Sequence, residues 1–558
     1  MHRDILYKGI LVSDFNLSNF ASYLRNNTED PPVEVSTTPF GQMMPILLDE
    51  NADFWKNSPD FAVVWTQPEI AIPSFKDILD FRLVAEKKIL EEVKEFATLI
   101  SDISKKVRFV FVPTWTTYSY RCFNLLNMKP ATGISNILMK INLQLLDSLE
   151  KNSNIYVLDA QVWVNNAGKN AFNPKLWYMA KIPFGNDVFI EAAVAIKSAL
   201  RGLTGNSKKL VIVDLDDTLW GGIVGDVGWE NLKLGGHDPI GEAFTDFQRA
   251  LKSLTHRGIL LGIVSKNEEK IVIEAFNKHP EMILKLEDFA GWKINWGDKA
   301  QNVVDLVSEL NLGLQSVVFI DDNPVERERI RQELPEVIVP EWPEDKTLYK
   351  RTLLNLPWFN IPSVSQEDSN RTKLYVNERQ RKELLTKVRS LDGWLQSLEI
   401  KVKVEDLNLS NLSRTAQLFN KTNQMNLSTR RLSESELWAW GNEKGHKLWT
   451  FRVSDKFGDS GITGIISLEW AGDSGQIIDF ILSCRVMGRK VEETMLYVAI
   501  QYAQTLGLRE IKAKYIPTSK NLPCLSFFKT SGFTNVEEYV FIWPGEKYFP
   551  KPMYITII

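Results

Sequence analysis

Hydrophobic and polar positions alternate between strand-like and helix-like periods over the first 200 residues. Residues 75–103 and 134–149 carry apolar side chains at helical spacing. Four short apolar runs are typical of buried strands, and they cover residues 7–12, 61–65, 107–113 and 155–158. Strands that alternate with helices indicate a parallel sheet, so the pattern predicts an α/β domain over residues 1–205.

The same alternation returns in residues 206–345, where three apolar runs end in polar side chains. Residues 211–213 lead into Asp214, Asp216 and Asp217, residues 259–264 into Ser265, Lys266 and Asn267, and residues 316–320 into Asp321 and Asp322. In open α/β sheets, ligands bind outside the carboxyl ends of the strands. We therefore expect these side chains to gather around one ligand.

The acidic cluster after the first of these strands indicates cation-dependent chemistry. Asp214 and Asp216 fall on one side of an extended segment, and Asp217 on the other. Neighbouring carboxylates repel one another, so a cation is needed to hold them together. An EF-hand calcium loop is excluded because Leu219 and Gly225 stand where that loop needs Gly and Glu. The pair suits Mg²⁺ and phosphate chemistry, in which one carboxylate attacks and the other transfers a proton.

Two later side chains fit the same chemistry. The Ser265 hydroxyl can donate to a phosphoryl oxygen, and Lys299, which opens a helix, can neutralise phosphoryl charge. Each also has an ordinary interpretation, as a helix cap and as a solvated lysine, and Asp321-Asp322-Asn-Pro is a good turn. Their order along the chain is the informative feature: acid pair, hydroxyl, lysine, acid pair.

This order resembles the haloacid dehalogenase superfamily. The resemblance implies that Asp214 is the nucleophile and Asp216 the acid/base. It implies a phosphate site made of Ser265, Lys266, Asn267 and Lys299, and a Mg²⁺ site made of Asp214, Asp216, Asp321 and Asp322. Only a glycine-rich segment, 221–236, and one helix, around 244–254, separate the first two motifs. That leaves little room for a cap domain, so a large partner could reach the site.

Composition limits the function classes. A chain of 558 residues should form about three domains. Its formal charge of −4, with no basic cluster, gives no support for nucleic-acid binding. Three cysteines, Cys122, Cys484 and Cys524, are too few for a disulfide framework or a zinc site. No secretory pattern and no apolar run of roughly 20 residues is present, so we expect a cytoplasmic protein without a membrane partner.

A linker with a charged helix, residues 346–395, leads to a region of different character, residues 396–558. Short β-rich runs cover 448–453, 461–470 and 477–482, and a helix is predicted from 491 to 506. Between them, Arg485-x-x-Gly488-Arg489 forms a turn whose amides could hold phosphate at a helix start. This turn resembles the pyrophosphate loop of GNAT acyltransferases, which implies a mixed α/β GNAT-like domain.

The whole chain resembles FkbH-like proteins, which combine SGNH-like, capless phosphatase and GNAT-like domains. The motifs that carry this resemblance are Asp214-Leu-Asp-Asp-Thr-Leu-Trp-Gly-Gly, Ser265-Lys-Asn, Phe319-Ile-Asp-Asp-Asn-Pro, Lys421-Thr-Asn-Gln-Met-Asn-Leu-Ser-Thr-Arg-Arg, Phe457-Gly-Asp, Ser483-Cys-Arg-Val-Met-Gly-Arg and Pro517-Thr-Ser-Lys-Asn. The resemblance implies a Mg²⁺-dependent phosphatase and acyltransferase. Such an enzyme loads a glyceryl unit from 1,3-bisphosphoglycerate onto the phosphopantetheine of an acyl carrier protein, and removes phosphate.

Three alternatives stay open: a phosphatase for a phosphorylated small molecule, an acetyltransferase for a sugar or polysaccharide precursor, and a carrier-binding scaffold. Lys490, where the family commonly has glycine, disfavours a diphosphate and hence free coenzyme A. Of the three cysteines, only Cys484 borders the turn, and we expect it to hold the acyl group, with His446 as a possible base. The ordinary interpretation of Cys484 is a small hydrophobic side chain buried in the core.

The N-terminal domain is expected to lack esterase activity. Ser13-Asp-Phe-Asn resembles a remnant of the SGNH nucleophile block, but a serine nucleophile needs a histidine base. His2 is the only histidine before residue 237, and it stands near the N-terminus. We therefore expect this domain to dock a carrier or another domain.

Overall fold

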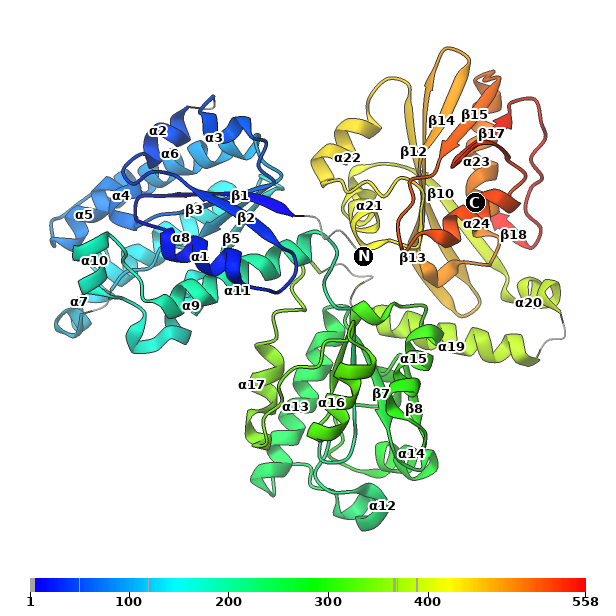
Figure 1. The fold of residues 1–558 in the computed structure, drawn as a ribbon, viewed down its shortest axis with the longest axis horizontal. Coiled ribbons are helices and arrows are strands. Elements are labelled where there is room, and N and C mark those ends of the chain that lie inside the picture. Colours follow the sequence, from blue (N-terminus) through cyan, green and yellow to red (C-terminus); the bar gives the residue numbers. More distant parts are fainter. Residues whose placement is uncertain (1–5, 50, 119, 365–367, 369, 388–389) are drawn as a thin grey trace. The chain divides into compact units, whose positions relative to one another are not determined.

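The structure is a computed structural model that describes residues 6–49, 51–118, 120–364, 368, 370–387 and 390–558. It divides into two compact units, Met1–Arg201 and Gly202–Ile558, and each is described by itself (Figure 1). The predicted α/β class is confirmed, because both units contain parallel strands separated by helices. No helix in the described ranges has the length and hydropathy to cross a bilayer.

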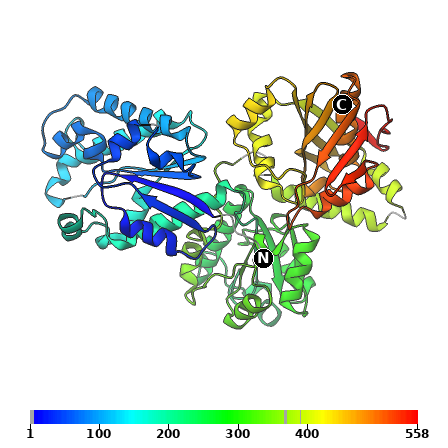
Figure 2. The same ribbon diagram turned by 45° about the horizontal axis from the view of Figure 1, so that its top comes forward.

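The first unit contains a parallel sheet with helices around it, drawn in blue and cyan in Figure 2. The sheet has five strands in the order β2-β1-β3-β4-β5, which is the flavodoxin-like order. Helices α6 and α8 pack together on one face, while Trp65 packs between Phe20 of α1 and Phe189 of α11. The strands are β1 (Tyr7–Ser13), β2 (Val33–Thr37), β3 (Phe61–Trp65), β4 (Phe109–Pro113) and β5 (Ile155–Leu158). The helices are α1 (Ser18–Asn26), α2 (Met43–Leu48), α3 (Asp53–Lys56), α4 (Pro68–Ala71), α5 (Pro73–Leu79), α6 (Glu86–Ser104), α7 (Asn124–Asn127), α8 (Ile134–Leu149), α9 (Ala160–Ala167), α10 (Pro174–Ala180) and α11 (Asn186–Leu203).

Two elements of this unit differ from the sequence prediction. The single helix predicted over 75–103 is two helices, α5 and α6, because the chain turns at Phe81, which adopts a left-handed φ of 56°. Strand β2 was not predicted; it lies at the sheet edge and pairs only with β1 in the described part of the chain.

The second unit begins with the region predicted from the sequence to be a phosphatase domain, which is called the phosphatase-like domain below and has a four-stranded parallel sheet ordered β8-β7-β6-β9. Its strands are β6 (Leu210–Val213), β7 (Leu260–Ser265), β8 (Gly291–Ile294) and β9 (Val317–Ile320). Its helices are α12 (Val224–Val227), α13 (Pro239–His256), α14 (Glu269–Lys278), α15 (Lys299–Glu309) and α16 (Pro324–Glu333). Between β6 and β7 the chain adds only α12, a 3-10 turn and α13, so no cap domain is inserted there.

The predicted linker starts later than residue 346. A 3-10 turn at Lys346–Leu348 and helix α17 (Tyr349–Leu354) pack against α13. Tyr349 is fully buried and makes edge contacts with Phe244 and Phe247. This part of the chain therefore belongs to the phosphatase-like core.

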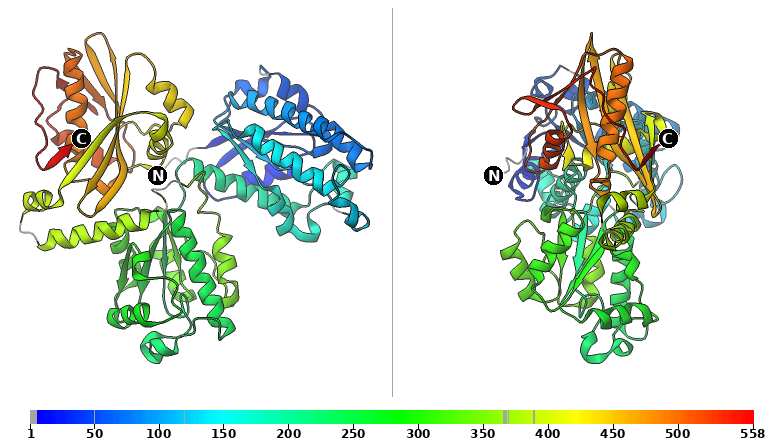
Figure 3. Two further views of the ribbon diagram at one scale, coloured as in Figure 1. Left: turned by 180° about the vertical axis from the view of Figure 1, so that it is seen from behind. Right: turned by 90° about the vertical axis from the view of Figure 1, so that its right-hand side faces the viewer.

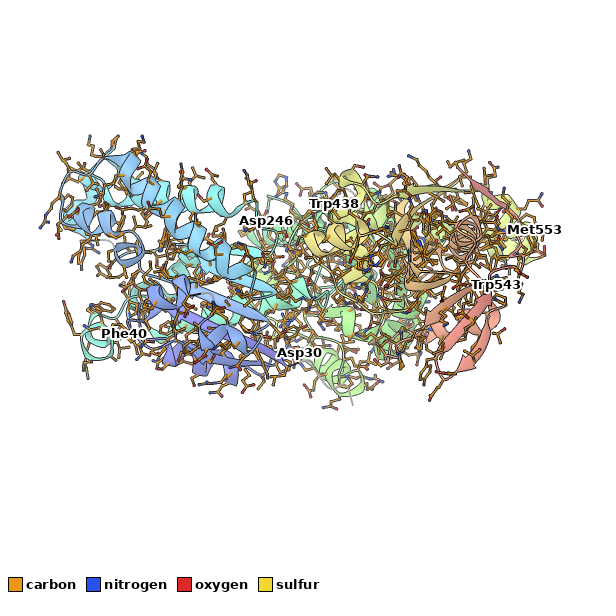
Figure 4. The ribbon with its side chains drawn as sticks, turned by 90° about the horizontal axis from the view of Figure 1, so that it is seen from above. Asp30, Phe40, Asp246, Trp438, Trp543 and Met553 are labelled. Carbon is orange, nitrogen blue, oxygen red and sulfur yellow. The ribbon has the colours of Figure 1, made fainter. Side chains whose placement is uncertain are left out.

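The C-terminal domain is built on a mixed sheet ordered β16-β17-β15-β14-β13-β12-β10-β18, with β11 paired to β14. Most neighbouring strands are antiparallel, but β14 and β15 run parallel from Ser474 to Ile477. Helix α22 carries Trp438, and strand β17 carries Trp543 (Figure 4). The strands are β10 (Ile400–Asp406), β11 (Met425–Asn426), β12 (His446–Asp455), β13 (Gly458–Ala471), β14 (Ser474–Leu482), β15 (Glu510–Lys514), β16 (Thr534–Glu537), β17 (Val540–Pro544) and β18 (Ile555–Ile557), and the helices are α20 (Leu391–Leu398), α21 (Leu409–Lys421), α22 (Glu434–Gly441), α23 (Val491–Thr505) and α24 (Leu522–Thr530).

Helix α19 (Arg371–Lys387) contacts β7 and β8 of the phosphatase-like sheet and β13 of the C-terminal sheet (Figure 3). A buried ion network holds its middle: the Arg381 guanidinium donates two 2.7 Å hydrogen bonds to Asp455, and Arg489 pairs with Glu378. The predicted connecting helix thus links the two sheets of this unit.

Candidate active site

Three carboxylates meet at the carboxyl edge of the phosphatase-like sheet. Asp214 directly follows β6, and its backbone N–H donates to the carbonyl of Ile320, the last residue of β9. Asp321 and Asp322 follow β9. One oxygen of each of Asp214, Asp321 and Asp322 lies within 4.8 Å of the others. The parallel pairing of β6 and β9 therefore brings together acids that are more than a hundred residues apart in sequence.

Lys299 is buried beside this trio at the first turn of α15. Its Nζ lies 2.6 Å from Asp321 Oδ2 and 3.2 Å from Asp214 Oδ2. The side chain of Asp298 caps the helix by accepting from the backbone N–H of Gln301, which fixes where α15 starts. Burial lowers the pKa of Lys299, but the attraction of Asp214 and Asp321 outweighs it and leaves that pKa above its usual value. The ammonium therefore stays charged at the centre.

Two lysines, Lys299 and Lys346, do not balance the three carboxylates. Burial raises the pKa of Asp321, and the charge of Asp214 raises it further. Burial also raises the pKa of Asp322. Asp214 Oδ1 is buried and has no hydrogen-bond partner in the described part of the chain. A partnerless buried oxygen within a carboxylate trio fits a hard divalent cation such as Mg²⁺.

Side chains that were not predicted orient Asp322. The Thr218 hydroxyl accepts from the Asp322 N–H at 3.0 Å and donates to Asp322 Oδ1 at 3.2 Å. Lys346 Nζ lies 3.6 Å from Asp322 Oδ2 and donates to the carbonyl of Asp217. Arg327 donates to the backbone carbonyls of Asp321 and Asp322. Thr218 stands inside the predicted motif, whereas Lys346 comes from the predicted linker.

The Asp216 carboxylate does not join the trio, although Asp216 was predicted as a metal ligand. Its Oδ1 accepts from Trp220 Nε1 at 2.9 Å and from the Val224 N–H at 3.0 Å, and its Oδ2 accepts from Asn267 Nδ2 at 2.9 Å. Asp217 has a left-handed φ of 52° and accepts from the Gly222 N–H. These bonds direct Asp216 toward the 221–236 segment and away from the cation position.

The predicted phosphate-binding residues divide into two groups. Ser265 ends β7 with its buried hydroxyl 3.1 Å from Asn267 Nδ2, and Asn267 in turn reaches Asp216. These two lie at the same sheet edge as Asp214. Lys266 instead forms a 2.6 Å ion pair with Glu326 on α16. In this arrangement, Lys299 is the lysine at the acidic centre and Lys266 is held at its rim.

Cys484 lies two residues after the end of β14 and is partly exposed, whereas Cys122 is exposed and Cys524 is buried. Cys484 borders two cavities, with volumes of about 340 and 550 Å³. His446 lines neither of them; it stacks on Trp440 at 4.4 Å between ring centroids. The structure therefore does not bring the predicted base His446 to the thiol.

The predicted phosphate turn after Cys484 is filled by the protein itself. The Gly488 N–H donates to Glu492 Oε1 at 2.7 Å. Arg489 is buried, pairs with Glu378 and donates to the carbonyl of Arg485. Lys490 adopts a left-handed φ of 64°. Only Arg485 of the three predicted turn residues lines the cavities beside Cys484.

In the first unit, Ser13 is buried at the end of β1, and its hydroxyl accepts from the Phe15 N–H at 3.1 Å. Asp14 accepts from the Gln67 N–H at 3.0 Å, and burial raises the pKa of Asp14 to about 7. No histidine is present among the described residues of this unit, and His2 lies outside them. The catalytic pair of an esterase is thus not assembled in the part that the structure describes.

The chain is similar to solved structures. A crystal structure of the N-terminal part of the protein BF1531 from Bacteroides fragilis, containing a phosphatase domain complexed with Mg, matches with a TM-score of 0.58 and 28% identity, over 64% of this chain and 95% of that one. That structure contains the cation predicted from the sequence, and its phosphatase domain agrees with the predicted phosphatase region.

Acetyltransferases match over a smaller share of the chain. The ribosomal-protein-S18-alanine N-acetyltransferase of Escherichia coli has a TM-score of 0.21 and 8% identity, over 26% of this chain and 96% of that one. A GNAT-family acetyltransferase of Staphylococcus aureus has a TM-score of 0.21 and 11% identity, over 26% and 99%. No family model and no curated protein matches the chain.

Proposed function

We propose that residues at the Asp214 centre form a Mg²⁺-dependent phosphatase. The observation that carries this proposal is the partnerless Asp214 oxygen beside Asp321, Asp322 and the charged Lys299. The similarity to a phosphatase domain complexed with Mg supports it. When bound, Mg²⁺ would neutralise charge on the transferring phosphoryl group, and Asp214, Asp321 and Asp322 would hold it.

The chain's own groups divide the reaction into two steps. An Asp214 oxygen attacks phosphorus, the ester P–O bond breaks, and the leaving oxygen takes a proton from Asp216. Water then attacks the phosphorus of the aspartyl phosphate and Asp216 accepts the proton from that water. The bond between phosphorus and the Asp214 oxygen breaks, which restores the Asp214 carboxylate and releases inorganic phosphate. One hydrogen bond to the Asp216 carboxylate comes from Val224 in the 221–236 segment and another from Trp220 just before it, so proton transfer is coupled to the position of this part of the chain.

We further propose that the C-terminal domain is a GNAT-like acyltransferase that loads an acyl carrier protein, as the FkbH-like resemblance implies. The Cys484 thiolate attacks the acyl carbon of an acyl phosphate such as 1,3-bisphosphoglycerate, and the bond to phosphate breaks. The pantetheine thiol then attacks the thioester, the bond to the Cys484 sulfur breaks, and the proton of the attacking thiol passes to the departing sulfur. The three-carbon unit thus ends on the carrier. The partly exposed position of Cys484 between two cavities supports this role. In this proposal the N-terminal unit, SGNH-like and without catalytic activity, docks the carrier.

Intact mass spectrometry of the protein, a carrier and an acyl phosphate tests the transfer. The full chain should gain the mass of the acyl group and pass it to the carrier, whereas Cys484→Ala should lose both signals and keep phosphatase activity. Cys122→Ala, which changes an exposed cysteine in the other unit, is the matched control and should behave as the unaltered chain does. Carrier loading at the normal rate by Cys484→Ala would overturn the role of Cys484 as the residue that holds the acyl group. Absence of carrier loading by the unaltered chain would leave phosphatase activity alone as the proposed function.

A further inference from the structure

The smaller cavity beside Cys484 is strongly cationic. Residues from the phosphatase-like domain, from α19 and from the C-terminal domain line it. Its six charged lining residues are Lys209, Arg371, Arg414, Lys421, Arg485 and Lys520, and no carboxylate is among the described residues that line it. Serine and asparagine side chains, Ser483, Ser519 and Asn423, add polar groups to the wall.

Two of the cations that line this cavity pair with a buried carboxylate. Asp368, which is buried behind the wall, accepts from Lys421 at 3.0 Å and from Arg371 at 2.8 Å. Burial, and next to it the positive charge of the nearby Arg371, lower the pKa of both Lys209 and Lys421 to about 8. An anion in the cavity would favour the charged state of both lysines.

This cavity is separate from the acidic centre. Lys209 directly precedes β6 and Asp214 directly follows it. At about 3.3 Å per residue of extended chain, the Cα atoms of Lys209 and Asp214 are about 17 Å apart. A phosphate held beside Lys209 therefore cannot also occupy the site at Asp214.

The larger cavity beside Cys484 has a different character. Three carboxylates, Glu269, Glu309 and Glu378, outnumber the two guanidinium groups that line it, Arg379 and Arg485. These acids repel a phosphate, whereas the guanidinium and ammonium groups of the smaller cavity are suited to bind one. The two cavities share four lining residues, Asn311, Tyr375, Cys484 and Arg485.

We propose that the cavity lined by Lys209, Arg414, Lys421 and Lys520 is a second phosphate-binding site, which holds the phosphate group of a small molecule or a pantetheine arm next to Cys484. The phosphate site rests on the cavity and its charges, and only the reaction at Cys484 rests on the proposed acyl transfer. The site would place the carbon atoms attached to that phosphate within reach of the thiol.

The test is the rate at which Cys484 of the full chain is alkylated in EDTA, followed by mass spectrometry of its peptide. Iodoacetate is an anion and iodoacetamide is neutral, so the cavity should favour iodoacetate at Cys484 by about threefold or more relative to Cys122. Inorganic phosphate and 3-phosphoglycerate should slow alkylation of Cys484 in a saturable way. No acyl donor or carrier is involved, so a failure of acyl transfer would leave this result unchanged.

Two single variants and a control assign the effect to the cavity. Lys520→Gln and Arg414→Gln should each reduce the iodoacetate preference and weaken phosphate protection by about tenfold. Lys444→Gln removes the same charge from an exposed position of the same domain and should change neither. Equal rates for the two reagents, no protection by phosphate, or equal loss in the control would overturn the proposal. Protection by coenzyme A at lower concentration than by 3-phosphoglycerate would assign the site to the pantetheine arm, and the reverse to a free phosphorylated acid.

Discussion

Replacing Lys299 by methionine should destabilise the phosphatase-like domain strongly in the absence of a cation. The change keeps the length of the side chain but removes the ammonium that lies 2.6 Å from Asp321 and 3.2 Å from Asp214. The two carboxylate oxygens are within 4.8 Å of each other. At that distance and an effective dielectric constant of about 20, two unit charges repel by about 3.5 kcal/mol, and in Lys299→Met the ammonium that offsets this repulsion is missing. A decrease of about 3 kcal/mol in the free energy of unfolding also agrees with the usual cost of leaving buried charges without their partner.

Hydrogen exchange of peptides from β6 and β9 measures this loss within one domain. In EDTA, the slowest amides of Lys299→Met should exchange roughly 100-fold faster than those of the unaltered chain, and Mg²⁺ should restore much of the protection. The matched control is Lys293→Met, which breaks an exposed ion pair with Glu309 in the same domain and should cost under about 1 kcal/mol. Equal exchange in the two variants, or no response to Mg²⁺, would refute the reasoning about the acidic centre.

Two further predictions concern residues around the sites. Thr218→Val keeps the side-chain shape but removes the hydroxyl that orients Asp322. The Mg²⁺ concentration needed for half-maximal phosphate release should therefore rise about 10- to 100-fold, and an unchanged Mg²⁺ dependence would contradict this. Burial raises the pKa of Asp14 from 3.8 to about 7, so ionisation of this carboxyl group opposes folding. The free energy of unfolding of the first unit should therefore fall by up to about 4 kcal/mol as pH rises from about 4 to 7. Asp14→Asn should remove this dependence when exchange of β1 amides is compared at pH 5 and pH 8, and an equal pH effect in the variant would assign it to another group.

The sequence predicts the acidic centre well because its geometry follows from strand order. Each of Asp214, Ser265 and Asp321 ends or follows an apolar run, and the carboxyl ends of parallel strands meet at one edge. Which way each side chain points is harder to predict. Asp216 accepts from Trp220 and Val224 because the chain turns sharply at Asp217, and two-residue alternation does not hold through such a turn.

Residues that reach a site through long-range packing were not predictable from spacing. Lys346 approaches Asp322 only because Tyr349 is buried against α13, and the proline-containing sequence around it is typical of a linker. Arg489 stands in a glycine turn before a helix, where a phosphate contact is a reasonable prediction. Its partners Glu378 and Asp455 come from α19 and β12, so its burial depends on tertiary contacts that the local sequence does not reveal.

The most direct test of the central claim is phosphate release from p-nitrophenyl phosphate as a function of Mg²⁺ concentration. The unaltered chain should release phosphate only with Mg²⁺, and Asp214→Asn should reduce the rate at least about 1000-fold. Asp305→Asn, which removes an exposed carboxylate from α15, should keep the full rate. Phosphate release that continues in EDTA, or that survives in Asp214→Asn, would contradict the assignment of this centre.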